Sequence, residues 1–334
     1  MKRKAILLLA VVLLVPATLL AGAHQKEDSD RGIFNGNDMF SCKPVHQIDE
    51  TPINPPNVQG DIPEPQQSTL TGKGPYKLFD NLYYVGNSFL NVGVFIVKTS
   101  AGLIIIDAGS NLIAKDGTWD CKIMEDLMEQ AGLDFADVKM ILLSHEHIDH
   151  YGCATRWQEK TWPPAPVAMS RIGWDNLRTW PVRAAFGGTR PEKIDTYLFD
   201  GQRIHLGDTT IQIVATPGHS MGTMSFIILV REGREKHVVG IMGGSAVQKS
   251  WGEAYMYWAS VEYFKQACEE AKCDVGLNAH TQNWPAGVLA AFLARKPGEP
   301  NPLVIGADNF DSRNLEYYRN RCRQMFQTLI NEGL

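Results

Sequence analysis

The apolar run Ile141–Leu143 ends in a dense cluster of titratable side chains, and this transition constrains the fold more than any other feature of the chain. The six residues from His145 to His150 include three histidines, one glutamate and one aspartate. A buried strand usually ends in a turn rich in Gly, Asn or Ser. Because this strand ends in potential metal ligands, we expect the fold to place a metal site at its carboxyl end.

The spacing within this cluster predicts two adjacent groups of ligands. Alternate side chains of an extended segment lie on one side, so His145 and His147 can face a common point while Glu146 points away. Asp149 and His150 begin the helix that follows and can reach a second point beside the first. The H-x-H-x-D-H pattern therefore offers two ligands to each of two metal ions.

Two histidines in the second half of the chain complete these groups. His219 follows a strand and the Pro217-Gly218 turn, and His280 ends the strand-like run CDVGLNAH. A catalytic zinc site usually has three protein ligands and an open position. We therefore assign one ion to His145, His147 and His219, and the other to Asp149, His150 and His280. Nitrogen and carboxylate ligands suit zinc, although the ligand types alone leave iron and manganese open. The histidines interpreted as ordinary surface or core residues are His24, His46, His205 and His237.

Strand-like runs precede interleaved helices twice along the chain. In the first half, strand patterns at 81–109 and 138–144 alternate with helical patterns at 123–132 and 150–159. The second half has strand patterns at 197–216, 224–244 and 273–280, and helical patterns at 260–272 and 314–330. Two similar halves of this kind predict an α/β fold with the sheets inside and the helices outside.

The N-terminus has the pattern of a secretory signal peptide. Lys2, Arg3 and Lys4 precede an apolar run from Ala5 to Leu20 and the small-residue cleavage pattern Ala21-Gly22-Ala23. An uncleaved anchor is the alternative, but the run is short beside the roughly 20 apolar residues of a membrane span. We expect a signal peptide at 1–23, an extended or partly disordered Pro-rich arm at 24–75 and one catalytic domain at 76–334. The mature protein is then periplasmic or secreted, with no membrane association.

Composition narrows the class of partner. Residues 1–23 carry three cations and no carboxylate, so their removal changes the net charge from -5 to -8. Without a cluster of Lys and Arg, a nucleic-acid partner is disfavoured, and we expect a monomer that acts on a small molecule. The chain has six cysteines. In an oxidising compartment an even number suggests disulfides, but six cysteines allow fifteen pairings.

The segments GLIIIDAG, SHEHIDH, TPGHS and NAH together resemble the metallo-β-lactamase superfamily over roughly residues 78–330. This resemblance implies an αββα sandwich with two zinc ions at one edge of its inner sheets. It also implies hydrolysis by attack of a metal-bound hydroxide on a carbonyl, with Asp149 orienting the nucleophile. Asp107, at the end of the run LIIID, is a candidate for fixing one of the ligand imidazoles.

The run Gly243-Gly244-Ser245 narrows the resemblance to the third subclass of metallo-β-lactamases, because no carboxylate stands where other branches bridge the two metals. In that subclass a serine matching Ser245 hydrogen-bonds near the second metal; filling a tight corner is the alternative role. The same resemblance implies a disulfide between Cys273 and Cys322. One departure is Val247, where the lactamases carry a Ser or Thr that helps to hold the substrate carboxylate.

The leading hypothesis is an exported di-zinc hydrolase that opens the amide ring of β-lactam antibiotics. The closest alternative is the same fold and metals acting as a lactonase or another cyclic ester or amide hydrolase, and a non-catalytic metal-binding or partner-binding protein is a third. Val247 favours the lactonase, whereas Ser245 and the cysteine spacing favour the lactamase. Candidates for an apolar rim around the substrate, with ordinary packing as the alternative, are Trp174, Trp180, Phe186, Trp251, Tyr255, Tyr257, Trp258 and Trp284.

Overall fold

The computed structural model describes residues 75–86, 92–113, 117, 119–179 and 194–334, all of which belong to one compact unit, Asn54–Leu334. The predicted signal peptide and all but the last residue of the predicted arm lie outside the described residues. So do Trp180, Phe186 and Cys42. The first strand among the described residues begins at Tyr76.

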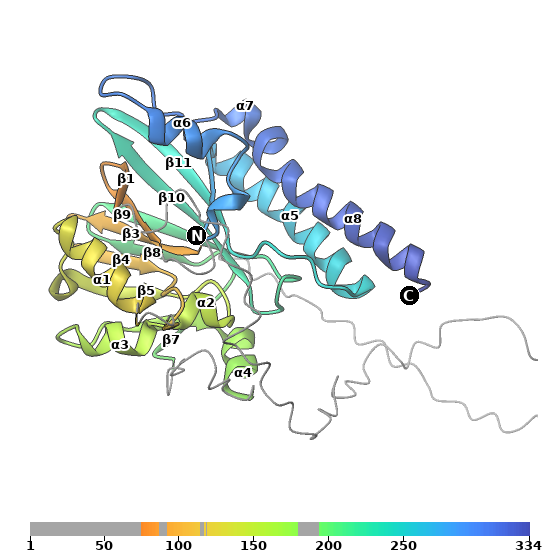
Figure 1. Ribbon diagram of the computed structural model, residues 1–334, viewed down its shortest axis with the longest axis horizontal. Coiled ribbons are helices and arrows are strands. Elements are labelled where there is room, and N and C mark those ends of the chain that lie inside the picture. Colours follow the sequence, from red (N-terminus) through yellow and green to blue (C-terminus); the bar gives the residue numbers. More distant parts are fainter. Residues whose placement is uncertain (1–74, 87–91, 114–116, 118, 180–193) are drawn as a thin grey trace, which may run out of the picture. The chain divides into compact units, whose positions relative to one another are not determined.

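Seven strands form the first sheet, in the same order as in the sequence (Figure 1). They are β1 (Tyr76–Phe79), β2 (Leu82–Gly86), β3 (Gly93–Thr99), β4 (Gly102–Ile106), β5 (Val138–Leu142), β6 (Val167–Ser170) and β7 (Thr196–Leu198). Pairing is antiparallel from β1 to β4 and parallel from β4 to β7. A parallel pair needs a crossover connection. Within the described residues, the helical elements of these connections are α1 (Asp120–Gln130), η1 (Phe135–Asp137), α2 (Ile148–Tyr151), α3 (Ala154–Glu159) and α4 (Arg171–Thr179).

Five strands form the second sheet, in the order β12-β11-β10-β9-β8. Their bounds are β8 (Arg203–Leu206), β9 (Thr209–Ala215), β10 (Met224–Glu232), β11 (Glu235–Met242) and β12 (Val275–Asn278). The pairing is antiparallel except between β11 and β12, which are parallel and joined through the long helix α5 (Trp251–Ala271). After β12 come η3 (Thr281–Asn283), α6 (Val288–Ala294), α7 (Ala307–Phe310), the π-helical turn η4 (Asp311–Leu315) and α8 (Glu316–Glu332).

Strand alternation divides the buried side chains of the first sheet between two hydrophobic clusters. Phe95 and Val97 of β3 belong to the cluster that also includes the second sheet and α5, whereas Val94 and Ile96 belong to the cluster formed with α1 and α3. All four are fully buried. The first sheet is therefore covered on both faces. This agrees with the sequence of β3, whose apolar run is continuous, as is usual for strands buried on both sides.

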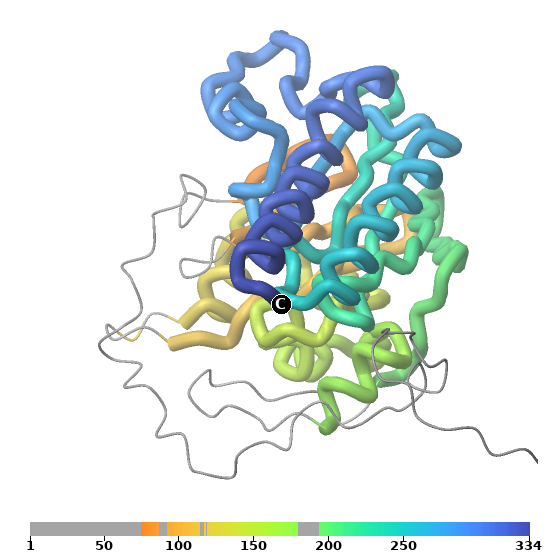
Figure 2. The backbone as a smooth tube through the Cα atoms, turned by 90° about the vertical axis from the view of Figure 1, so that its right-hand side faces the viewer, coloured from red at the N-terminus to blue at the C-terminus, as the bar shows by residue number. Residues whose placement is uncertain are grey.

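This arrangement confirms the predicted αββα sandwich. Helices α1 and α3 pack on the outer face of the first sheet, and α5 and α8 lie side by side on the second (Figures 1 and 2). Among the described helices, none is long and apolar enough to cross a membrane.

The helix predicted at 150–159 consists of two short helices, α2 and α3, which are separated at Gly152 and Cys153. The amides of these two residues donate to the carbonyls of Gly109 and Ala108, and the Ala108 amide donates to the carbonyl of His150. A side chain at position 152 would lie within 2.4 Å of the Asn111 amide nitrogen. Glycine therefore allows the segment after β4 to pack directly against the helix that carries Asp149 and His150.

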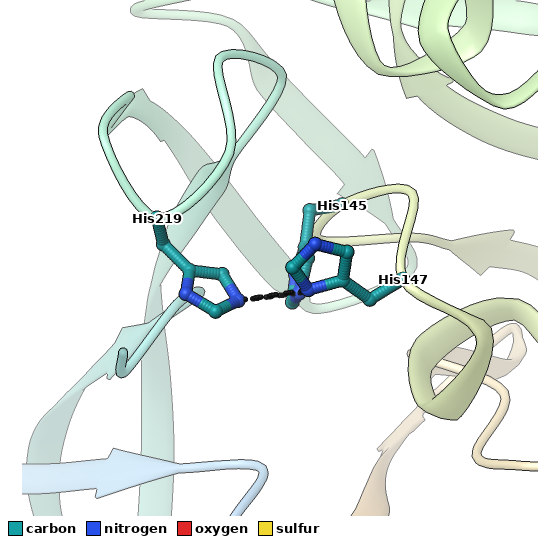
Figure 3. A group of neighbouring side chains, drawn as sticks. All are labelled: His145, His147 and His219. Atoms are coloured by element: carbon teal, nitrogen blue, oxygen red, sulfur yellow. Dashed lines mark hydrogen bonds between the residues drawn. The ribbon is translucent and has the colours of Figure 1, made fainter. Parts of the chain in front are cut away.

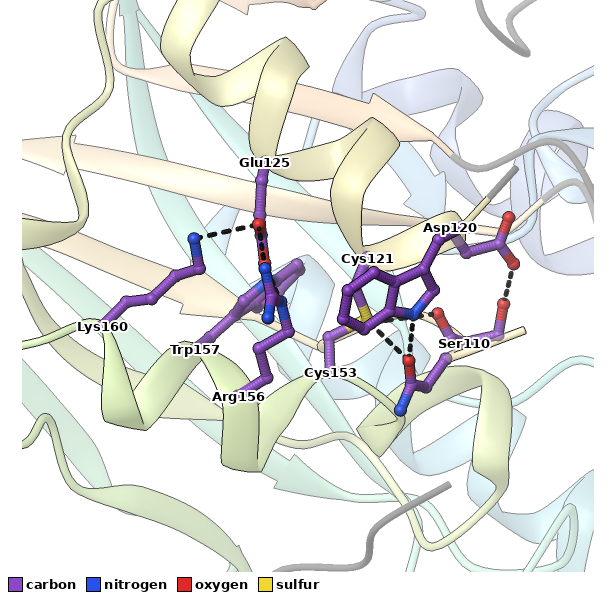
Figure 4. The surroundings of a disulfide bond; sticks show 10 residues. Ser110, Asp120, Cys121, Glu125, Cys153, Arg156, Trp157 and Lys160 are labelled. Atoms are coloured by element: carbon purple, nitrogen blue, oxygen red, sulfur yellow. Dashed lines mark hydrogen bonds and ion pairs between the residues drawn. A yellow bond between two sulfur atoms is a disulfide. The ribbon is translucent and has the colours of Figure 1, made fainter. Parts of the chain in front are cut away.

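A disulfide joins Cys121 of α1 to Cys153, the residue before α3 (Figure 4). The two cysteines are 32 residues apart, so the bond contributes about 3–4 kcal/mol in the chain-entropy model. An ion pair links the same two helices, because the buried Glu125 carboxylate accepts from Arg156 and Lys160 of the α3 segment. Cys153 is therefore a structural cysteine.

The predicted Cys273–Cys322 disulfide is wrong in this structure, where both residues are buried free thiols, as is Cys268. Helices α5 and α8 are antiparallel, and Glu262 pairs with Arg319 while Trp258 contacts Phe326. Cys322 therefore lies level with residues 258–262. Cys273 lies past the end of α5, where the chain turns back and the Cys273 amide donates to the Cys268 carbonyl. Cys268 is six residues beyond Glu262, about 9 Å along the helix axis at a rise of about 1.5 Å per residue, which already exceeds the Cα–Cα distance that a disulfide allows.

We predict that this thiol pattern will be found in the purified protein. After unfolding in iodoacetamide without reductant, peptides containing Cys268, Cys273 and Cys322 should carry the label. The Cys121 and Cys153 peptides should remain linked until reduced, as peptide mass spectrometry would show. A linked Cys273–Cys322 peptide pair would contradict the helix register described above.

Candidate metal centre

The first predicted ligand group meets at the carboxyl ends of strands from both sheets. His145 follows β5, His147 is the residue before α2, and His219 lies in the loop between β9 and β10. Figure 3 shows the three imidazoles converging on one point. His145 is fully buried and His219 is 8% exposed.

Their ring nitrogens have the spacing of ligands on one ion. His145 Nε2 lies 3.1 Å from His147 Nδ1, and His219 Nε2 lies 3.1 Å and 3.0 Å from these two atoms. Adjacent nitrogens on a tetrahedral zinc, with bonds of about 2.0–2.1 Å, are about 3.3–3.4 Å apart. The three histidines therefore fit a single zinc ion.

Hydrogen bonds on the far side of two of these rings point to the same conclusion. His145 Nδ1 lies 2.9 Å from Ser144 Oγ, and His219 Nδ1 lies 2.8 Å from the carbonyl oxygen of Ala246. We assign the ring protons to these Nδ1 atoms from their partners. Two Nε2 lone pairs then face each other, an arrangement that a cation between them would stabilise.

The surroundings keep this group in the neutral form that binds metal. Burial, with the neighbouring imidazoles acting in the same direction, lowers the pKa of His145 well below its usual range. Burial and His147 lower the pKa of His219 to about 3. The pKa of His147 is also lowered, chiefly by burial.

The second group, Asp149, His150 and His280, is also assembled. Its three ligand atoms lie within 4.8 Å of one another, and Asp149 Oδ2 is 3.3 Å from His280 Nε2 and 3.6 Å from His150 Nε2. Burial alone would raise the pKa of Asp149, but His150 and His280 outweigh it and hold that pKa below its usual range. The carboxylate is therefore ionised and available as a ligand.

Asp107 fixes the ring of His150, as the sequence suggested. Its Oδ2 lies 2.8 Å from His150 Nδ1, and its Oδ1 accepts from the Ser144 amide at 2.7 Å. Burial would lower the pKa of His150, but the carboxylates of Asp107 and Asp149 raise it. Asp107 has a φ of 64°, a left-handed conformation that is uncommon outside Gly, Asn and Asp. The backbone thus turns sharply to bring this carboxylate under the ligand ring.

Sequence reasoning missed two groups that hold these ligands. The hydroxyl of Ser144 lies 2.9 Å from His145 Nδ1 and 3.3 Å from His150 Nδ1. The Ala246 carbonyl orients His219. A serine after a strand and a backbone carbonyl carry no recognisable sequence signal, so only the three-dimensional structure could identify them.

The segment Gly243-Gly244-Ser245 packs against the His219 loop. A side chain at position 244 would lie within 2.4–2.7 Å of His219 ring and Cβ atoms, so glycine allows this contact. Ser245 itself is half-buried. Val247 is 9% exposed and belongs to the core. The Gln248 side chain donates to the His219 carbonyl at 2.7 Å, and Lys249 pairs with Glu332 of α8.

The candidate aromatic rim is only partly compatible with the structure. Tyr257 is fully buried and donates to the Gly244 carbonyl at 2.8 Å. Trp284 is 6% exposed and packs edge-on against Tyr84. These two residues therefore belong to the core, in line with the packing alternative. Trp251 and Tyr255 are exposed on α5, where Trp251 stacks on Phe326 of α8. Trp174 and Trp258, two further candidates for the rim, are half-buried. Trp174 packs against the hydrophobic cluster that the first sheet forms with α1 and α3, and Trp258 packs against the cluster between the sheets.

Comparison with known proteins places these features in a family. A family model described as the metallo-beta-lactamase superfamily matches residues 88–231. An N-acyl homoserine lactonase, AttM, of Agrobacterium fabrum is 29% identical over 161 residues, which cover 41% of this chain and 59% of that protein. A beta-lactamase hydrolase-like protein of the same organism is 22% identical over 245 residues, covering 70% of this chain and 54% of the relative. The chain thus spans less than two thirds of the length of these curated relatives.

Solved structures share the fold along nearly their whole length. BJP-1 of Bradyrhizobium japonicum, a subclass B3 metallo-beta-lactamase, is 25% identical with a TM-score of 0.63, and the match covers 79% of this chain and 96% of that one. The metallo-beta-lactamase FEZ-1 of Legionella gormanii is 19% identical with a TM-score of 0.64, covering 80% and 99%. This chain thus has the fold of these metallo-beta-lactamases, and its residues 88–231 match the model of the metallo-beta-lactamase superfamily.

Proposed function

We propose that this protein is an exported hydrolase that holds two zinc ions and opens the amide ring of β-lactams. The observation that carries the proposal is the convergence of two ligand groups, each of three side chains, from the ends of strands in both sheets. Zinc bound in such a site supplies a nucleophile from water near neutral pH and polarises a substrate carbonyl.

The residues of the chain itself prepare the site for this chemistry. Asp107 holds the Nδ1 proton of His150, and the Ala246 carbonyl holds that of His219, so that each Nε2 is free to bind an ion. Asp149 orients the attacking water, because its carboxylate lies between the imidazoles of His150 and His280. By resemblance to the third subclass, we assign to the half-buried Ser245 a hydroxyl hydrogen bond near the second ion.

The choice of a β-lactam substrate rests on similarity and on one residue. BJP-1, which is described as a subclass B3 metallo-beta-lactamase, matches this chain along 96% of its own length. Ser245 occupies the position at which we match a serine of that subclass, and it replaces the bridging carboxylate of other branches. Together these features favour a cyclic amide over other substrates of the superfamily.

A lactone is the second candidate, and it is favoured by the residues that follow Ser245. Val247 is buried in the core, Gln248 binds the His219 carbonyl and Lys249 is paired with Glu332. None of these three is positioned as a ready partner for the carboxylate that β-lactam antibiotics carry beside the ring. A lactone has no such group, and AttM is described as an N-acyl homoserine lactonase.

Export is supported by the chemistry of the described cysteines. The Cys121–Cys153 disulfide is typical of proteins that fold in an oxidising compartment. We therefore propose cleavage of the signal peptide at 1–23 and a periplasmic or secreted mature protein. A small-molecule substrate requires no protein or nucleic-acid partner, and we propose that the mature protein is a monomer.

We predict zinc-dependent turnover of β-lactams by the mature protein. Purified protein with zinc should hydrolyse members of a panel of penicillins, cephalosporins and carbapenems, and a chelator should abolish the activity until zinc is restored. Turnover of lactones alone, including N-acyl homoserine lactones, would refute the proposal that β-lactams are the substrate, but it would still agree with a zinc-dependent hydrolase. Bound zinc without turnover of any substrate would contradict a hydrolytic function.

Replacing a ligand from the second half should disable the site. His219→Ala should lower kcat/KM more than about 100-fold, beyond the 10–100-fold range of residues that only support a ligand, and should lower the bound zinc by one equivalent. His205→Ala is the matched control, because His205 lies on β8 and contacts Thr210. A His219 variant that keeps both its zinc content and its activity would rule out the proposed ligand set.

The support of His150 by Asp107 can be tested without straining the backbone. Asparagine has the same shape as aspartate and tolerates a positive φ, so Asp107→Asn should fold normally. Loss of the carboxylate should weaken binding of one zinc ion about 10–100-fold in a chelator competition. Asp134→Asn, at a surface cap of η1, should leave both affinities unchanged. Equal zinc affinities in the Asp107 variant and the native protein would refute this role.

A further inference from the structure

Glu146 is a buried carboxylate placed between two metal-ligand residues. It is 1% exposed, and its partners come from two other segments of the chain. Oε1 accepts from the Asn176 side chain of α4 at 2.7 Å, and Oε2 accepts from the hydroxyl of Ser220 at 2.7 Å. The side chain is thus directed away from the ligand rings, as strand alternation predicted, and toward the loop that carries His219.

The two hydrogen-bond partners that Glu146 has among the described residues, Asn176 and Ser220, are neutral. Burial of an ionised carboxylate costs free energy that hydrogen bonds to neutral donors offset only in part. Among the described residues, no ion pair of Glu146 with a lysine or arginine is present. A side chain kept in this position at such a cost requires a reason beyond packing.

The contacts around Glu146 join three segments closely. The Ser170 hydroxyl donates to the Gly222 carbonyl at 2.6 Å. A side chain at position 222 would lie 2.4 Å from backbone atoms of Gly173 and 2.9 Å from Glu146 Oε2. The start of α4, the turn with His145 and the loop with His219 therefore meet at this carboxylate.

We propose that Glu146 is a positioning residue that fastens the His219 loop against the turn carrying His145 and His147. Ser220 is the neighbour of His219, so its hydrogen bond to Glu146 fixes the loop next to the ligand itself. We call Glu146 with its bonds to Ser220 and Asn176 the Glu146 clamp. It joins His219, a ligand from the second half of the chain, to His145 and His147 from the first half. It thereby holds the three ring nitrogens together before a metal ion binds, and the inference rests on the zinc site of the proposed function.

Two substitutions of Glu146 distinguish the effect of its hydrogen bonds on zinc affinity from the effect of its charge. Glu146→Ala removes both hydrogen bonds, and its zinc affinity in a chelator competition should fall about 10–100-fold, as for other groups that orient a ligand. Glu146→Gln keeps one acceptor, and Asn176 can turn its amide to accept from the new NH₂ group. Its zinc affinity should therefore stay within about 3-fold of that of the native protein.

Two further variants act as controls. Glu125→Ala removes another buried carboxylate, one that pairs with Arg156 between α1 and α3, and should lower stability without changing zinc affinity. Ser220→Ala breaks the bond between Glu146 and the His219 loop, together with a contact of the Ser220 hydroxyl with Thr223 inside that loop, and it keeps the bond to Asn176. It should lose part of the affinity lost by Glu146→Ala, and it provides the decisive comparison if Glu146→Ala does not fold.

The possible outcomes separate this inference from the proposed function. Native zinc affinity in Glu146→Ala, or in Ser220→Ala if the former is unfolded, would overturn the clamp and leave the metal site intact. An equal loss in Glu146→Gln and Glu146→Ala would also overturn it, because the charge rather than the hydrogen bonds would then matter. Failure of the native protein to bind zinc would refute the metal site and the clamp together.

Discussion

The metal centre depends on one geometric constraint, namely that the carboxyl ends of strands from two different sheets lie at a common edge. Parallel pairing of β4 with β5 sets Asp107 beside the turn that carries His145, and parallel pairing of β11 with β12 lays the strand that leads to His280 beside the strand that leads to Gly244. Backbone hydrogen bonds then cross between the sheets at this edge. The amide of Met224 donates to the Ser144 carbonyl at 2.8 Å, and that of Gly93 donates to the Ala279 carbonyl at 3.0 Å.

These connections concentrate groups that would otherwise repel each other. The ring nitrogens of the first group lie within 3.1 Å of one another with their lone pairs converging, and the loops that carry them are held from behind by Asp107, Ala246 and Glu146. Such an arrangement costs free energy in the absence of a cation. The hydrophobic packing of both sheets and the α1–α3 disulfide supply the rigidity that maintains it.

The sequence predicted the metal ligands that lie directly after strands, but it did not predict contacts that depend on how helices and loops pack. His219 and His280 could be grouped with the H-x-H-x-D-H cluster because each follows a strand, and the structure brings both to it. The Cys273–Cys322 disulfide could not be judged, since it depends on the register of α8 on α5, which side-chain packing sets. The start of α5 was placed nine residues too late, although Ser250 and Glu253 form a recognisable N-terminal capping signal. The partners of Glu146, far away in sequence, left no pattern to recognise.

The most direct test of the account is the location of zinc in a crystal of the mature protein, found by anomalous scattering at the zinc absorption edge. We expect two peaks at the common edge of the sheets. One should lie about 2.0–2.1 Å from the converging nitrogens of His145, His147 and His219, and the other beside Asp149, His150 and His280. A zinc-soaked crystal with these six side chains unliganded, or with zinc bound elsewhere, would contradict the account.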